Sequence, residues 1–338
     1  VDLEVAPLYS GDTWIETVAD SRGVQVTVHY SISQLPAVGS NGYKPRVADD
    51  RVGYFLTAIK DFSDRDDPEH FVRYINRWNL EPLNSELELS PPKEPIIFII
   101  EKTVPVFLRA TVEEAILEWN RAFEACGYTG AIQVMHEEVA EARFNIDIQP
   151  EDVNYNFFRW ITAEAGFAMG PSRIDPRTGQ ILDADIIFDA GFLDSWKRSY
   201  ETLTPEEAQY LIPNWTPETT AHNALGLPCC ASCSYSYLMQ HQNAFAAAAM
   251  MATGEISADG DLPLDFVHQG LKEVVMHEVG HTLGLRHNFR ASSWKSMADI
   301  NNLEQGQAEG TIASVMDYAP ANISPPGTPQ GLYYSQTL

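Results

Sequence analysis

The stretch of sequence that decides the fold runs from His277 to His287 and reads HEVGHTLGLRH. It agrees with the pattern H-E-x-x-H-x-x-G-x-x-H at every fixed position. Apolar residues at helical spacing precede it, with Asp265 available as a cap, so the pattern predicts a helix that carries His277 and His281 on one face. A helix that carries histidines by coincidence is the alternative. It is disfavoured because a chain with only 9 His and 21 Gly rarely meets every fixed position.

Each fixed residue of this motif has a physical task. Two imidazoles one helical turn apart can bind one Zn²⁺ at about 2.0–2.1 Å, which leaves positions for a third ligand and a water. Gly284 allows the chain to leave the helix through a positive φ, so that His287 can return towards the metal. Glu278 stands beside a ligand, where it can take a proton from water. The motif therefore predicts one catalytic zinc on His277, His281 and His287, with Glu278 as general base.

A second segment, residues 314–318, reads SVMDY and resembles the Met-turn that passes beneath the zinc in metzincins. A lone methionine usually packs in a core, but the position of Met316 after the zinc motif favours the Met-turn. Tyr318 matches a tyrosine that astacin-like and serralysin-like metzincins place near the metal. Three roles stay open for Tyr318 here: zinc ligand, donor to an oxyanion, or packing.

The two segments make the chain resemble the metzincin clan. With the stretches 111–127, 170–173 and 175–179, it resembles more closely a bacterial family of secreted zinc-dependent metalloproteases. The resemblance covers about residues 95–338. It implies an α/β (α+β) catalytic domain with a twisted mixed sheet, an active-site helix and an antiparallel edge strand, for which Phe167–Ile174 is the candidate. The residues expected to pair with an extended substrate are Gly166, Phe167, Ala168, Met169 and Gly170.

The implied activity is that of an endopeptidase acting on a peptide or protein substrate. In this interpretation Glu278 activates water and returns the proton to the leaving amine, and Tyr318 is a second catalytic candidate. The rival interpretation is a catalytically silent or autoinhibited module that carries zinc and binds proteins or peptides. The intact Glu278 disfavours a purely structural site, which needs four protein ligands and no general base.

Composition restricts the partners and the compartment. The chain has 338 residues, of which 44% are hydrophobic and 20% charged, as in globular proteins. Its 22 basic and 47 acidic residues give a formal charge of -25, which would repel phosphate backbones, so nucleic acid is not an expected partner. No apolar run is long enough to span a membrane, and the sequence does not begin with the basic stretch and apolar segment typical of a signal peptide. Together with the resemblance, this predicts a secreted or cell-envelope protein, extracellular or periplasmic, whose signal peptide has been removed; the sequence carries no signal for its oligomeric state.

A change of composition near residue 92 predicts two parts. Residues 1–92 have the alternating and aromatic patterns of strands and form a β-rich N-terminal module. The Pro-rich stretch 90–95 predicts a linker. Residues 93–338 then form the catalytic domain, with an insertion at about 190–264. Because the members of the resembling family continue beyond the Met-turn, we expect the native chain to extend past this sequence.

Local patterns predict individual elements of these two parts. Ile96–Ile100 is a short run of β-branched residues typical of a buried strand. Thr111 and Glu114 have the spacing of a capping box, so a helix is predicted from Thr111 to Gly127 with Cys126 buried. The other expected elements are strands at 14–18, 25–30, 52–59, 132–135 and 144–148, helices at 71–78 and 237–252, and a hairpin of 167–174 with 181–188.

Two further clusters could bind metal or serve structure. Cys229, Cys230 and Cys233 could form a thiolate site with a fourth ligand such as His222, or disulfides in an exported protein, or a free thiol that blocks the zinc. The acidic stretches 61–67 and 259–261 could bind Ca²⁺. Neither stretch has EF-hand spacing, so solvated loops and helix caps are the favoured interpretation.

Overall fold

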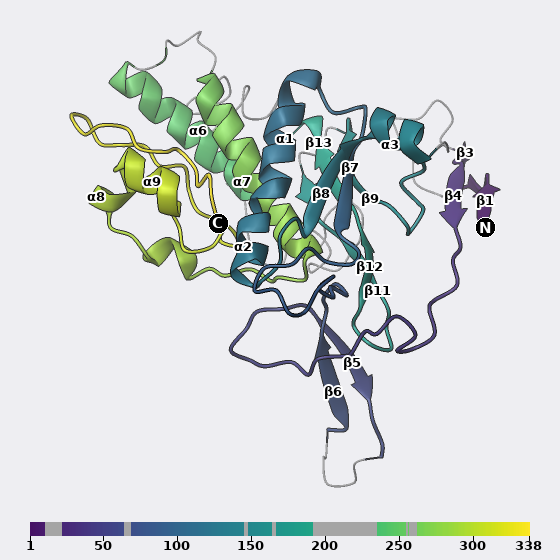
Figure 1. Cartoon of the computed structure of the whole chain (residues 1–338). Helices are drawn as coiled ribbons and strands as arrows, with labels where there is room; N and C mark the ends of the chain where they lie inside the picture. Colours follow the sequence, from purple (N-terminus) through teal and green to yellow (C-terminus); the bar gives the residue numbers. More distant parts are fainter. Residues whose placement is uncertain are drawn as a thin grey trace.

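The computed structural model describes residues 1–10, 22–63, 69–144, 148–163, 167–191, 235–254, 256 and 262–338. Within these residues the largest sheet has five strands in the order β10-β13-β9-β7-β8 (Figure 1). Strands β13, β9, β7 and β8 run parallel to one another, and β10 runs antiparallel to β13. The predicted mixed sheet with an antiparallel edge strand is therefore confirmed.

Each of the described strands is six residues long or shorter. They are β1 (Asp2–Val5), β2 (Leu8–Tyr9), β3 (Val24–Gln25), β4 (Val28–Ser31), β5 (Leu56–Lys60), β6 (Phe71–Ile75), β7 (Ile96–Ile100), β8 (Ile132–His136), β9 (Asn156–Ile161), β10 (Ala168–Met169), β11 (Ser172–Ile174), β12 (Ile181–Ala184) and β13 (Ile186–Asp189). Among the described residues the helices lie after residue 105. They are α1 (Val106–Glu118), α2 (Asn120–Ala125), α3 (Glu137–Phe144), α6 (Tyr235–Thr253), α7 (Leu264–Thr282), α8 (Met297–Ile300) and α9 (Leu303–Glu309), with a 3₁₀ turn at Ala291–Ser293.

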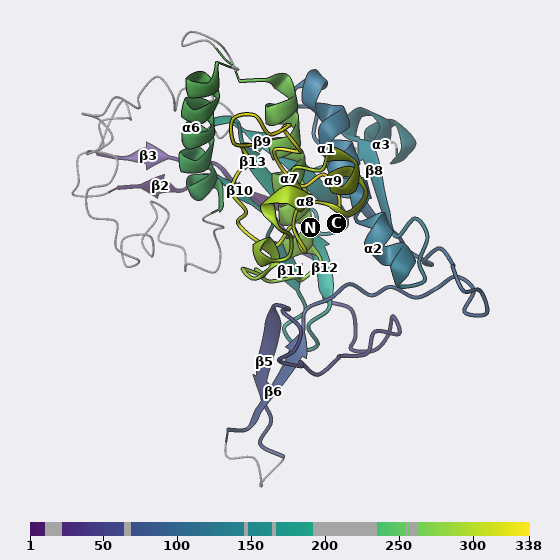
Figure 2. The ribbon, with the colours of Figure 1, turned by 90° about the vertical axis from the view of Figure 1, so that its left-hand side faces the viewer.

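The core lies between the five-stranded sheet and the helices α1 and α7 (Figures 1 and 2). Phe98 and Ile100 of β7 face these helices, where they join a cluster that includes Leu108 and Met276. Ile99 points to the opposite face and packs with residues of α3 and β9. Because β7 is buried on both faces, its sequence is continuously apolar, as predicted for a central parallel strand.

The described part of the N-terminal region is β-rich, as predicted. Its strands form separate two-stranded ribbons, which are β1 with β4, β2 with β3, and β5 with β6. In Figure 1 the ribbon of β5 and β6 projects from the body of the molecule as an arm. The predicted helix at 71–78 is wrong, because Phe71–Ile75 forms strand β6 and pairs in register with Leu56–Lys60. Its residues alternate in exposure with a period of two, and the partner strand outweighs the local helix-start signal.

Three other local predictions need correction. Helix α1 begins at Val106 after Pro105, whose fixed φ suits a helix start, so Thr111 lies inside the helix and is not its cap. Cys126 is exposed rather than buried. Phe144 ends helix α3, where we expected a strand, and Lys102 pairs with Glu137 at the beginning of that helix.

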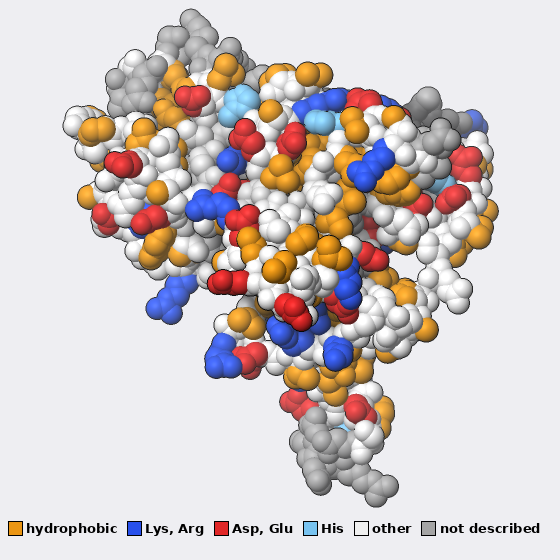
Figure 3. Space-filling view, viewed as in Figure 1, with side chains coloured by type: hydrophobic (Ala, Val, Ile, Leu, Met, Phe, Trp, Pro, Cys, Tyr) orange, Lys and Arg blue, Asp and Glu red, His pale blue; other side chains and the backbone are white. Residues whose placement is uncertain are grey.

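The region predicted as an insertion is described only in part. Helix α6 confirms the predicted helix at 237–252, and it packs on the core through Ala246, Ala247 and Met250. Residues 192–234 lie outside the described residues. No helix among the described residues is long and apolar enough to cross a membrane. On the described part of the face in Figure 3, acidic and basic side chains are interspersed rather than gathered by sign.

Candidate metal centre

Helix α7 carries the central part of the site. It runs from Leu264 to Thr282 and buries His277, Glu278 and His281. The prediction that Asp265 caps this helix is wrong. Pro263 is the N-terminal cap, and Asp265 lies in the first turn. The helix ends as the sequence predicts, because Gly284 has a φ of 94° and redirects the chain.

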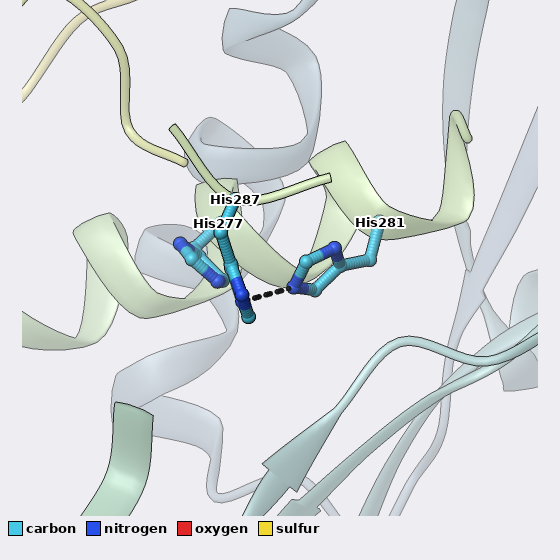
Figure 4. A group of neighbouring side chains, drawn as sticks. All are labelled: His277, His281 and His287. Atoms are coloured by element: carbon cyan, nitrogen blue, oxygen red, sulfur yellow. Dashed lines mark hydrogen bonds between the residues drawn. The ribbon is translucent and has the colours of Figure 1, made fainter. Parts of the chain in front are cut away.

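The three histidines of the motif lie together. One ring nitrogen from each of His277, His281 and His287 lies within 4.8 Å of the other two, which is the only arrangement of this kind among the described residues. Their rings are turned towards one another in Figure 4, two from α7 and one from the chain after it. Nε2 of His281 lies 3.1 Å from Nε2 of His287. The three nitrogens are close enough to bind a single metal ion.

Backbone carbonyls set the tautomer of two of these rings. Nδ1 of His277 lies 2.6 Å from the carbonyl oxygen of Val315, and Nδ1 of His281 lies 2.9 Å from that of Leu285. A carbonyl can only accept, so each Nδ1 carries the proton and each Nε2 keeps its lone pair for a metal. Such contacts fix the orientation of a ligating ring and increase its basicity.

Burial also favours the neutral, metal-binding form of the rings. It lowers the pKa of His277 well below its ordinary value and lowers the pKa of His281. For His287, burial and then the neighbouring His281 lower the pKa to about 4. Zinc binds neutral imidazole, so the protonation state and the donor set of the site both fit this metal.

The segment of Met316 lies beneath the helix. A Cβ added at Gly280, between the two helical histidines, would clash with the sulfur of the buried Met316. The carbonyl of Met316 accepts the N–H of Asn288 at 2.8 Å, just after the third histidine. The segment therefore supports the histidines from below, as expected for a Met-turn.

Tyr318 reaches the site from the same segment. Its hydroxyl lies 2.9 Å from Nε2 of His287, and its ring meets the ring of His287 edge-on with centroids 4.5 Å apart. The phenol therefore lies beside the ring nitrogen of His287 that faces the other two histidines, where it could ligate a metal ion, donate a hydrogen bond or both.

The edge strand lies against the part of α7 that carries the histidine motif. Strand β10 pairs with β13, and the carbonyl of the preceding residue, Phe167, extends this pairing by accepting the N–H of Asp189 at 2.9 Å. A Cβ added at Gly170 would clash with the carbonyl oxygen of Glu278. The expected strand 167–174 is split at Gly170 and Pro171 into β10 and β11, because proline has no N–H for a ladder. Gly166 lies outside the described residues.

Two aromatic rings at the site were missed. The ring of Phe55 lies 5.7 Å from that of His281, and the ring of Phe289 lies 5.2 Å from that of His287, measured between centroids. Phe289 follows the third histidine by two residues, so its sequence position could have indicated it. Phe55 gave no such signal, because it belongs to the N-terminal region.

The other candidate sites gain no support. Asp61 accepts the N–H and O–H of Ser63, which explains this carboxylate as part of a local turn and does not support a calcium site. Residues 64–68, residues 257–261 and the cysteine cluster with His222 lie outside the described residues.

Comparison with known proteins matches family models to two separate regions of the chain. Residues 259–337, which include all three histidines and the Met316 segment, match a family model described as Met-zincin. This region is of the metzincin type. Residues 8–83 match a second model, described as a domain of unknown function (DUF5117). Neither the curated proteins nor the solved structures give a match to the chain. The metzincin match and the histidine triad together suggest a zinc-dependent peptidase; the closer bacterial family stays a prediction.

Proposed function

We propose that the chain is a zinc-dependent endopeptidase with Glu278 as general base. The observation that carries this proposal is the convergence of three neutral histidines on one side of a helix that also bears the buried Glu278. A structural zinc site takes four protein ligands, whereas a catalytic site keeps a position for water or substrate. Three histidines beside a carboxylate fit the catalytic kind.

The residues of the site divide the work. Bound zinc would supply a Lewis acid that polarises the scissile carbonyl. Glu278 is buried in α7, next to His277 in the chain, and is the group proposed to take a proton from water and to give it to the leaving amine. The hydroxyl of Tyr318, at Nε2 of His287, is placed to donate to the developing oxyanion.

The substrate is expected to lie along β10. This strand is at the edge of the five-stranded sheet, and its outer side pairs with no other strand among the described residues. The clash that a side chain at Gly170 would make with Glu278 places this edge beside the helix. An extended peptide could therefore pair with the edge and bring one of its carbonyls to the metal.

Binding of a peptide along β10 predicts a dependence on peptide amides with a period of two. In a peptide that ends in a metal-binding group, methylation of every second amide is expected to weaken inhibition, because only alternate N–H groups of an added strand face the sheet edge. The measurement is the inhibition constant for a series methylated at one amide at a time. Equal effects at successive amides, or a complex with the peptide far from both β10 and the histidines, would contradict the proposal.

Tyr318→Phe is expected to keep zinc and to lower kcat by up to about a hundredfold, the lower range for loss of one oxyanion donor. Three imidazoles already satisfy the metal, so the phenol is not required to hold it. Zinc content and kcat are measured on the same preparation. Loss of zinc from a folded variant would show that Tyr318 is a ligand.

The proposed activity is tested by digestion of a peptide library with the zinc-loaded chain. Cleavage is expected, is abolished by a chelator and returns when zinc is added. If cleavage appears only after limited proteolysis within residues 190–264, the chain is an autoinhibited peptidase. If no peptide is cleaved before or after trimming, a zinc-bearing module that binds peptides becomes the better account. Export of the protein and the division of the chain near residue 92 stay predictions.

A further inference from the structure

The loop between the second and third histidines is bound to a segment of the N-terminal region. The N–H of Phe55 donates to the carbonyl of Gly284 at 2.8 Å, and the N–H of Arg286 donates to the carbonyl of Gly53 at 2.9 Å. Tyr54 and Leu285 thereby form an antiparallel bridge. The chain thus pairs backbone to backbone across two regions that are far apart in sequence.

The bridged residue Leu285 is also the one that orients His281. Its N–H donates to the carbonyl of Gly280 at 3.0 Å, and its carbonyl accepts from Nδ1 of His281 at 2.9 Å. In an antiparallel bridge of this kind, the polar groups of the central residue point away from the partner strand. Fixing the residues on both sides of Leu285 therefore aims its carbonyl at the histidine.

A second N-terminal segment, residues 75–78, holds the same loop. A Cβ at Gly284 would clash with the carbonyl oxygen of Asn76, so the two backbones touch at this point. The indole N–H of Trp78 donates to the carbonyl of Thr282 at 2.9 Å, at the last residue of α7. The N–H of Asn76 donates to the carbonyl of Phe55 at 2.8 Å, which ties the second segment to the first.

The other side of this segment is bound to the hairpin that follows β10. The N–H of Arg77 donates to the carbonyl of Gly179 at 3.1 Å, and the N–H of Ile181 donates to the carbonyl of Arg77 at 2.9 Å. Gly179 has a φ of 78°, and a Cβ there would lie 2.8 Å from the carbonyl oxygen of Ile75. Residues 75–78 therefore lie between the metal-binding loop and the β11–β12 hairpin.

We propose that residues 53–55 and 75–78 are positioning residues of the metal centre, which hold Leu285 so that its carbonyl orients His281 and which fix the spacing between that loop and the β11–β12 hairpin. This inference rests on the proposed zinc site. It gives the N-terminal region of unknown function a physical role, because that region completes the outer support of the metal centre. Loss of an outer-shell partner of a metal ligand typically weakens metal binding about 10- to 100-fold.

Gly179→Ala tests the proposal from the side away from the metal. The added methyl must displace the carbonyl of Ile75 and shift residues 75–78. The matched control is Gly327→Ala, since Gly327 has a similar φ of 84° but no atom within 4 Å of an added Cβ. Both variants place alanine at a similar positive φ, so the two substitutions cause similar backbone strain. Only Gly179→Ala is expected to weaken zinc binding, by about tenfold or more, and to change the visible spectrum of the Co²⁺-substituted protein.

Trp78→Phe provides a second variant if Gly179→Ala does not fold. It removes the indole donor to Thr282 and keeps an aromatic ring, and the control is Trp294→Phe at a half-exposed tryptophan. We expect weaker zinc binding and an altered Co²⁺ spectrum for Trp78→Phe alone. If Gly179→Ala or Trp78→Phe lowers Tm yet leaves zinc affinity and the Co²⁺ spectrum as in the wild type, the contacts are merely structural and the inference is overturned. A wild-type chain that binds neither metal would overturn the proposed function, and the inference with it.

Discussion

Replacing Glu278 by Gln is expected to lower kcat by at least about a hundredfold while zinc stays bound, since this is the lower range for loss of a general acid–base group. Glutamine has the shape of glutamate and no basicity, so water is no longer deprotonated by the side chain. Glu278 is fully buried beside His277 in helix α7, and the substitution leaves the histidines and their carbonyl partners unchanged. Metal affinity and fold are therefore expected to match the wild type.

The informative measurement is kcat at matched zinc occupancy, because some hydrolysis supported by the metal persists without the base. Glu273→Gln is the matched control in the same helix. Glu273 is buried and accepts the N–H of Ser335 at 2.5 Å, so its loss is expected to lower Tm without a comparable loss of kcat. Equal kcat values for Glu278→Gln and the wild type would remove Glu278 from catalysis.

The sequence predicts those parts of the site that depend on particular side chains at a fixed spacing in the chain. His277 and His281 share a helix face because the helical period is 3.6 residues, and Gly284 leaves the helix with φ of 94° because glycine tolerates that conformation. The sequence also predicts strand β7, because a strand that is buried on both faces is continuously apolar. In each case a local rule was sufficient.

The support around the histidines follows no local rule. Val315 and Leu285 orient the rings through backbone carbonyls, which every residue has, so their side chains carry no trace of the role. The sequence predicts a helix where β6 lies, because the pairing of β6 with β5 outweighs the helix-start signal that precedes it. The hydrogen bond of Phe55 to Gly284 joins segments that lie far apart in the chain, and a single sequence gives no visible signal of such a pairing.

His281→Ala is expected to abolish stoichiometric zinc binding, with a loss of affinity greater than the roughly 10- to 100-fold that removal of an outer-shell partner costs. The substitution removes one of three converging nitrogens and leaves His277 and His287 with too few donors for a stable site. His268→Ala is the matched control, because His268 lies in the same helix and contacts the hydroxyl of Thr111 at 2.7 Å, away from the triad.

Zinc content after dialysis and the rise in Tm on adding zinc report the same binding in two ways, since a ligand that binds only the folded state stabilises it. The wild type and His268→Ala are expected to retain about one zinc per chain and to gain Tm with zinc. His281→Ala should do neither, although its fold persists without metal because α7 is held by Val274, Val275 and Met276 in the core. Zinc content in His281→Ala equal to that of the control would mean that the metal is bound elsewhere, and the whole assignment of the centre would fail with it.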